Sequence, residues 1–201
     1  MTAIVLLRHG VTDWNADGRF QGHADIPINH TGREQAAAAA AALAGQGISR
    51  VYCSDLLRAT ETAQIVAGRL GLGVTRDERL REVDVGEWSG LSMEEAGRLE
   101  PDFWPALRQG RDFRRSATGE TATESGVRVG GALRDYASGA AADEVVLVVG
   151  HGLSLRVAAL LLIGLDYSHA RFFGGLRNCH WAALAPGAEH WRLLSYNVGP
   201  A

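Results

Sequence analysis

Several apolar segments of this sequence end near histidine or arginine, side chains that can hold an anion and attack phosphorus. The segment AIVLL leads directly into Arg8 and His9, and EVVLVVG leads into His151. Arg58 lies four residues beyond a third such segment, SRVYCS. If the three segments are strands of one parallel sheet, their carboxyl ends bring these four side chains to one edge.

Two arginines and two histidines at one place indicate chemistry on a tetrahedral oxyanion such as phosphate. The forked donors of Arg8 and Arg58 match the oxygens of such an anion. A histidine between them can act as a nucleophile toward phosphorus. Neighbouring cations lower the pKa of a histidine, which keeps His9 neutral and nucleophilic near pH 7. The glycine after each histidine, Gly10 or Gly152, is expected to let a ligand approach the backbone closely.

The elements expected around these residues alternate between strand and helix. EVVLVVG is an unbroken apolar run, which is typical of a strand covered on both faces. Helical segments follow SRVYCS and EVVLVVG, and two strand-like segments, CHWAALA and HWRLLSYN, close the chain as a pair. This order predicts an α/β fold, doubly wound, with a mainly parallel central sheet flanked by helices.

A capping-box pattern predicts one helix, and the chain length predicts the domain organisation. Thr31 and Glu34 fit a capping box, which predicts a helix from about Gly32 to Ala44. At 201 residues the chain is expected to form a single domain, residues 1–201. Residues 83–121 are expected to form an excursion, or lid, beside the sheet.

Composition argues against several classes of partner. The net charge is −3 and no long basic block is present, so no nucleic-acid partner is expected. The longest apolar run, residues 157–163, is too short to span a membrane, and the first apolar run does not fit a signal peptide. A cytoplasmic protein is therefore expected. Cys53 and Cys179 are expected to be small buried residues rather than nucleophiles.

Motifs spread along nearly the whole chain resemble the histidine phosphatase superfamily, in its phosphoglycerate-mutase-like branch. The resemblance rests on RHG at residues 8–10 together with later blocks in the family's order. These blocks are RFQGHADIPINHTGREQA, SDLLRATETA, LREVDVGEWSG, GETATE and VVGHGLSLR. One departure is mild: the family usually has Gly-Glu-Ser where this chain has Glu120 followed by Thr121.

The resemblance implies a role for each candidate site residue. His9 would be the nucleophile that becomes a phosphohistidine, and Arg8, Arg58 and His151 would clamp the phosphate. Glu82 would give a proton to the leaving group and then serve as the base for water. The residues expected to bind substrate are Asn15, Gln21, Gly22 and Gly152.

Glu82 also allows a less specific interpretation. Its neighbours Val83 and Val85 could bury the carboxyl group and hold it protonated, as a general acid requires. Arg79 or Arg81 could instead make it one half of a surface ion pair.

The segment RQGRDFRR in the predicted excursion leaves two interpretations open. Its arginines could form a solvated face, or they could recognise an anionic tail of the substrate. The four are Arg108, Arg111, Arg114 and Arg115.

The predicted function is metal-independent hydrolysis of a small phosphorylated metabolite, a sugar phosphate or a phosphoglycerate derivative, through a phosphohistidine. No cofactor and no metal site are expected, because the sequence lacks HExxH and an obvious carboxylate cluster. The expected partner is the small phosphomonoester itself, and the family also suggests a homodimer through the sheet edge.

Two alternatives stay open at this point. The first is a cofactor-dependent phosphoglycerate mutase, although those enzymes are longer and carry an additional basic, tyrosine-bearing stretch. The second is an inactive family member that binds a phosphorylated partner, which would more often have lost His9 or Glu82. Among phosphatases, the segments FFGGLRNCHWAAL and HWRLLSYN loosely resemble actinobacterial glucosyl-3-phosphoglycerate phosphatases. A broad-specificity phosphomonoesterase, a sugar-bisphosphate phosphatase and an α-ribazole phosphatase also stay open.

Overall fold

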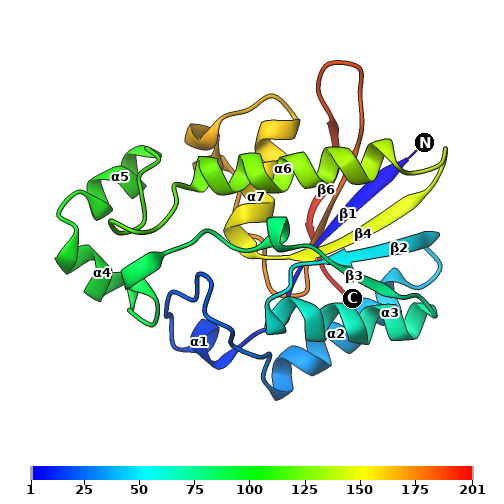
Figure 1. Cartoon of the computed structure of the whole chain (residues 1–201), viewed down its shortest axis with the longest axis horizontal. Coiled ribbons are helices and arrows are strands. Elements are labelled where there is room, and N and C mark those ends of the chain that lie inside the picture. Colours follow the sequence, from blue (N-terminus) through cyan, green and yellow to red (C-terminus); the bar gives the residue numbers. More distant parts are fainter. Residues whose placement is uncertain (1, 201) are drawn as a thin grey trace.

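A six-stranded sheet lies between two layers of helices in the computed structural model, which describes residues 2–200 (Figure 1). The strand order is β3-β2-β4-β1-β5-β6, with parallel pairing from β3 to β1 and antiparallel pairing on both sides of β5. The predicted mainly parallel, doubly wound fold is confirmed. The strands are β1 (Ala3–Arg8), β2 (Ile48–Cys53), β3 (Val74–Arg76), β4 (Val145–Gly150), β5 (Trp181–Ala185) and β6 (Arg192–Val198).

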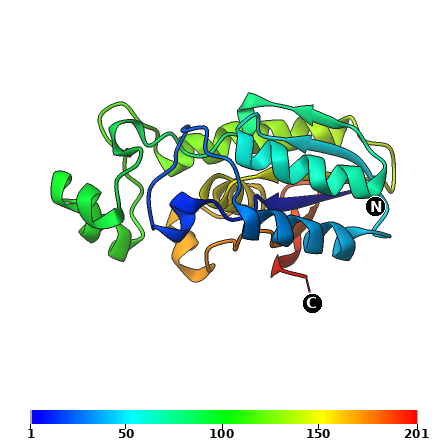
Figure 2. The same cartoon turned by 90° about the horizontal axis from the view of Figure 1, so that it is seen from below.

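Alternate side chains of the central strand β1 serve the two helical layers. Ile4 and Leu6 join the core formed with α6 and α7, whereas Val5 and Leu7 join the core formed with α2 and α3. Figure 1 shows the sheet between these layers, and Figure 2 looks through the layer of α2 and α3 onto the sheet. The helices of the two layers are α2 (His30–Leu43), α3 (Leu57–Leu70), α6 (Ala122–Ser138) and α7 (Gly152–Leu162).

The helix α2 begins earlier than the sequence predicts, and the expected capping residue is wrong. Asn29, not Thr31, is the N-cap, and its side chain accepts a hydrogen bond from the Gly32 amide at 2.9 Å. Asparagine is among the strongest N-cap residues, and here it precedes the threonine. The helix therefore starts two residues before the expected Gly32, at His30.

The excursion after Glu82 extends past the carboxyl ends of the strands in both views (Figures 1 and 2). Four buried residues, Val85, Trp88, Ala96 and Phe103, form a small core of its own. Phe20 from the loop after α1 packs against this core, with its ring 5.9 Å from that of Trp88. The short elements on this side are α1 (Asp13–Ala16), η1 (Glu78–Leu80), η2 (Gly86–Trp88), α4 (Met93–Leu99), α5 (Phe103–Gln109) and η3 (Tyr167–Phe172).

Both cysteines are buried, as the sequence predicts. Burial raises the pKa of the Cys53 thiol to about 11 and that of Cys179 to about 12, so neither forms a ready thiolate. Within residues 2–200, no helix is both long enough and apolar enough to cross a membrane.

Candidate active site

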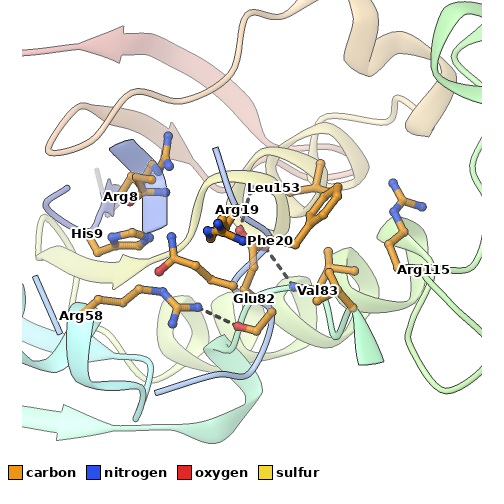
Figure 3. Close-up of a pocket in the computed structure, with 13 residues that line it drawn as sticks. Arg8, His9, Arg19, Phe20, Arg58, Glu82, Val83, Arg115 and Leu153 are labelled. Atoms are coloured by element: carbon orange, nitrogen blue, oxygen red, sulfur yellow. Dashed lines mark hydrogen bonds between the residues drawn. The ribbon is translucent and has the colours of Figure 1, made fainter. Parts of the chain in front are cut away.

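A cavity of about 220 Å³ opens where the strands β1 and β4 end (Figure 3). Arg8, His9 and Arg58 line one side of it, and Arg115 from the excursion lies on the opposite side. The cavity is strongly cationic, because Glu82 is its one acidic lining residue. The full lining is Arg8, His9, Asn15, Arg19, Phe20, Gln21, Gly22, Arg58, Glu82, Val83, Val85, Arg115 and Leu153.

The imidazole of His9 is held in one tautomer by its own neighbour. Its Nδ1 lies 2.7 Å from the carbonyl oxygen of Gly10. A carbonyl can only accept a hydrogen bond, so Nδ1 carries the proton and Nε2 keeps its lone pair. Burial lowers the pKa of His9 well below its usual range, and the charges of Arg58 and Arg8 lower it further. The sequence predicted the effect of the cations, but burial is the larger cause.

Arg58 organises three parts of the site at once. Its Nε donates to Nδ1 of His151 at 3.2 Å, and its two terminal nitrogens donate to the carbonyls of Gly22 and Ala24, both at 2.7 Å. Burial lowers the pKa of Arg58 to about 10, so it stays charged near neutral pH. The helix α3 supplies this residue in its first turn, and the guanidinium lies under the loop that carries Gly22.

His151 presents a hydrogen-bond donor beside His9. Since its Nδ1 accepts from Arg58, the proton of the neutral ring is on Nε2, which is buried and has no partner within residues 2–200. Burial lowers the pKa of His151 well below its usual range, and Arg58 adds to this. The rings of His9 and His151 are 5.3 Å apart. A buried donor without a partner lowers the stability of the fold unless a ligand accepts a hydrogen bond from it.

Arg8 likewise keeps part of its guanidinium free. One terminal nitrogen donates to the carbonyl of Leu176 at 2.7 Å, and Nε is buried without a partner among the described residues. Burial lowers the pKa of Arg8.

The structure corrects the reason for the two glycines. A Cβ at Gly152 would lie 3.2 Å from Nε of Arg8, and a Cβ at Gly10 would collide with the backbone of Gly32. Protein atoms therefore fill the space that was expected to admit a ligand.

Glu82 is bound by the start of α7 rather than buried in an apolar pocket. Its carboxylate accepts backbone hydrogen bonds from Leu153 at 3.1 Å, from Ser154 at 2.8 Å and from Val83 at 3.0 Å. These three hydrogen bonds hold both oxygens of the Glu82 carboxyl group at the start of α7. The first turn of a helix offers such free amides.

The surface ion-pair interpretation of Glu82 is excluded, because Arg79 and Arg81 form ion pairs with other carboxylates. Arg79 pairs with Asp77 and Asp135, and Arg81 pairs with Asp55. Glu82 is left facing the cavity.

Three of the four expected substrate-binding residues lie between β1 and α2, with Asn15 in α1, whereas Gly152 begins α7. Gln21 is buried, and its Oε1 has no partner among the described residues. Asn15 uses its Oδ1 to accept from Thr12 and from Asn178, which leaves its amide hydrogens for the cavity. Gly22 has a φ of +48°, and a side chain there would meet Val85.

The loop before β5 supplies a contact that the sequence did not reveal. Asn178 donates to the carbonyl of His9 at 2.9 Å and to Oδ1 of Asn15 at 3.3 Å. It therefore ties together two candidate site residues more than 160 positions away in the chain. No local motif marks it, because its role depends on the antiparallel placement of β5 beside β1.

The four arginines of residues 108–115 do not act together. Arg115 alone lines the cavity, where Asp112 pairs with it at 2.7 Å and Tyr167 accepts from it at 3.2 Å. Arg111 and Arg114 pair with acidic residues outside the cavity. Arg19, which the sequence analysis did not single out, lines the cavity from the loop after β1.

A family model for the histidine phosphatase superfamily, branch 1, matches residues 4–199. The chain belongs to this family. The RHG segment, Arg58, Glu82 and His151 all lie within the matched range, in agreement with the resemblance of the motifs.

Relatives of this chain carry names of two kinds. A probable phosphoglycerate mutase of Yersinia pestis is 36% identical over 201 residues, which cover all of this chain and 93% of that protein. A mycobacterial glucosyl-3-phosphoglycerate phosphatase, solved with VO3, superposes with a TM-score of 0.91 at 31% identity, covering 98% and 99% of the two chains. A phosphoserine phosphatase of Entamoeba histolytica, solved with phosphoserine, gives 0.85 at 27% identity, covering 98% and 97%.

Proposed function

We propose that this protein hydrolyses a small phosphomonoester through a phosphohistidine at His9, without a metal. The observation that carries the proposal is the free Nε2 of His9 beside the cationic side chains of the cavity. The structural neighbours named as phosphatases of phosphoglycerate and phosphoserine derivatives support a small anionic metabolite as the substrate.

In the first step, Nε2 of His9 attacks phosphorus and the bond to the leaving oxygen breaks. Arg8, Arg58 and the Nε2 hydrogen of His151 stabilise the negative charge on the three remaining phosphoryl oxygens. Glu82, the acidic residue that lines the cavity, gives the proton that the leaving oxygen takes up.

In the second step, water attacks the phosphohistidine. Glu82, now a carboxylate, takes a proton from this water as the new P–O bond forms and the P–N bond to His9 breaks. The neutral Nε2 of His9 is restored, and inorganic phosphate leaves. Residues 83–121 act as a lid in this proposal, because Val83, Val85 and Arg115 close the cavity on the side away from the sheet.

The test is release of inorganic phosphate from a panel of compounds in the presence of EDTA. The panel contains p-nitrophenyl phosphate, 3-phosphoglycerate, glucosyl-3-phosphoglycerate and phosphoserine. Wild-type protein is expected to release phosphate, and His9→Ala is expected to release none. Release by His9→Ala at the wild-type rate would show that the mechanism is wrong.

A second candidate, phosphoglycerate mutase, is favoured by the name of the Yersinia pestis relative. The sequence argument from length does not separate this chain from that relative, because 201 residues cover 93% of it. A mutase must return the phosphoryl group to a second hydroxyl instead of to water. Conversion of 3-phosphoglycerate to 2-phosphoglycerate on addition of 2,3-bisphosphoglycerate, with little phosphate release, would favour the mutase.

A further inference from the structure

A second cavity, of about 230 Å³, adjoins the candidate active site along the start of α7. It shares Arg8, Glu82 and Leu153 with the first cavity, so these three residues border both spaces. Its other walls are Gly152 and Arg156 of α7 and the loop at residues 175–176. The second cavity therefore lies directly beside the candidate active site.

Arg156 gives the second cavity an unsatisfied cation. No carboxylate within residues 2–200 pairs with it, and its one hydrogen bond, from Nη1 to the carbonyl of Phe173, is long at 3.3 Å. Its Nε is buried and has no partner among the described residues. Nε and Nη2 form one edge of the guanidinium, and this edge can bind two oxygens of one anion.

The position of Arg156 relative to the reacting groups is set by helix geometry. A Cβ added at Gly152 would lie 3.2 Å from Nε of Arg8, and Arg156 follows Gly152 by four residues on the same face of α7. The spacing is about one helical turn, or about 5.4 Å along the axis. Arg8, beside Gly152, and Arg156 therefore both border the second cavity.

The neighbouring loop leaves the cavity open. A methyl group at Gly175 would meet no protein atom within 4 Å, and its φ lies outside the left-handed region, so neither packing nor backbone geometry requires glycine there. The loop is nevertheless held in place, because Tyr196 and Asn197 of β6 donate to the carbonyls of Gly174 and Gly175 at 2.6 and 3.1 Å. The wall is thus fixed in position, and Gly175 adds no side chain to it.

Arg115, which lines the first cavity opposite His9, is less suited to a second anion. Its guanidinium already pairs with Asp112 and donates to Phe113 and Tyr167. An anion that bound there would compete with a carboxylate that is already in place.

We propose that Arg156 and the adjoining cavity bind a second anionic group of the substrate, a carboxylate or a phosphate. This proposal rests on the proposed phosphomonoesterase function and narrows its substrates to phosphomonoesters that carry two anionic groups.

The experiment measures competitive inhibition of p-nitrophenyl phosphate hydrolysis by matched pairs of compounds. 3-Phosphoglycerate and glycerol 3-phosphate differ by a carboxylate in place of a hydroxymethyl group. Fructose 1,6-bisphosphate and fructose 6-phosphate differ by one phosphate. For wild-type protein, the member with the second anion is expected to bind about 10- to 100-fold more tightly in at least one pair.

Arg156→Gln is expected to bring that ratio close to one, and the ratio removes any loss common to both compounds. Arg69→Gln, an exposed arginine of α3 far from both cavities, is the matched control and should keep the wild-type ratio. The proposal would be overturned if wild type binds both members of each pair equally tightly. It would also be overturned if the preference for the second anion persists in Arg156→Gln, or is lost in Arg115→Gln instead.

Failure of the proposed function gives a different result. If wild type does not hydrolyse p-nitrophenyl phosphate, binding of the same pairs is measured by calorimetry. The proposed second-anion site is then tested by the ratio of the two dissociation constants in each pair, in wild type and in Arg156→Gln.

Discussion

At the scale of single residues, the candidate site depends on which nitrogen or oxygen is free. In the proposed mechanism Nε2 of His9 can attack, because the Gly10 carbonyl holds the proton on Nδ1. Arg8 and His151 each keep one buried donor unpaired among the described residues. These donors can therefore bind an anion in the cavity. The terminal nitrogens of Arg58, in contrast, donate to the carbonyls of Gly22 and Ala24 and hold that loop.

The role of Glu82 as proton donor predicts an effect that depends on the leaving group. In Glu82→Gln, kcat/KM for an alkyl phosphate such as glycerol 3-phosphate is expected to fall about 100-fold or more. The fall for p-nitrophenyl phosphate should be much smaller, because nitrophenolate leaves without a proton. Glu87→Gln, an exposed glutamate of η2, is the control. Equal losses for both substrates would contradict a role as general acid.

The two buried histidines predict how stability depends on pH. Burial lowers the pKa of His9 and of His151 in the folded protein well below the value of about 6.5 in the unfolded chain. Below pH 6.5 the unfolded chain therefore binds more protons, and the free energy of unfolding falls as the pH drops. The fall approaches about 1.4 kcal/mol per pH unit for each histidine until the pH reaches its folded pKa.

Urea unfolding of wild type and His151→Asn between pH 7.5 and 5.5 measures this effect. The variant should lose about half of the histidine-dependent fall, whatever its stability at pH 7.5. The same pH dependence in both proteins would contradict the expected neutral state of His151.

At the scale of elements, capping explains why one departure from the family pattern is mild. Thr121 is the N-cap of α6, and its hydroxyl accepts from the Glu124 amide while the Glu124 carboxylate accepts from the Thr121 amide. A serine performs the same capping. Thr121→Ala is therefore expected to lower the free energy of unfolding by about 1 kcal/mol, with Thr121→Ser close to wild type. Urea titration checks this, and a neutral alanine variant would contradict it.

The elements also show how far the sequence could lead. Arg8, His9, Arg58 and His151 could be placed together because strand ends of a parallel sheet meet at one edge, which a one-dimensional pattern reveals. Asn178 and Arg156 could not be found in this way. Their importance comes from the antiparallel strand β5 and from the space beside α7, and both depend on contacts between residues far apart in the chain.

The cap of α2 illustrates the local limit of sequence patterns. Asn29 and Thr31 are both good N-cap residues, and the capping-box pattern favoured the threonine. Contacts of the residues before the helix select Asn29 as the N-cap, because the Asn29 amide donates to the Val11 carbonyl and its side chain donates to Asp13.

The homodimer and the cytoplasmic location stay predictions.

At the scale of the whole molecule, the candidate site joins segments from most of the chain. Arg8 and His9 come from β1, Arg58 from α3, Glu82 from the segment after η1, and His151 from the end of β4. An anion that binds between these groups binds the folded protein and not the unfolded chain, because only the fold brings the groups together. Binding must therefore stabilise the fold as a whole.

Inorganic phosphate is expected to raise the melting temperature for this reason. At a phosphate concentration about 100 times its Kd, the stabilisation is about 2.7 kcal/mol, while sodium chloride at equal ionic strength should give little. Arg58→Ala is expected to remove most of the phosphate-dependent shift, and Arg69→Ala should retain it. Thermal unfolding in matched buffers measures the shift. A shift of equal size with both salts would mean that ionic strength, not a phosphate site, stabilises the protein.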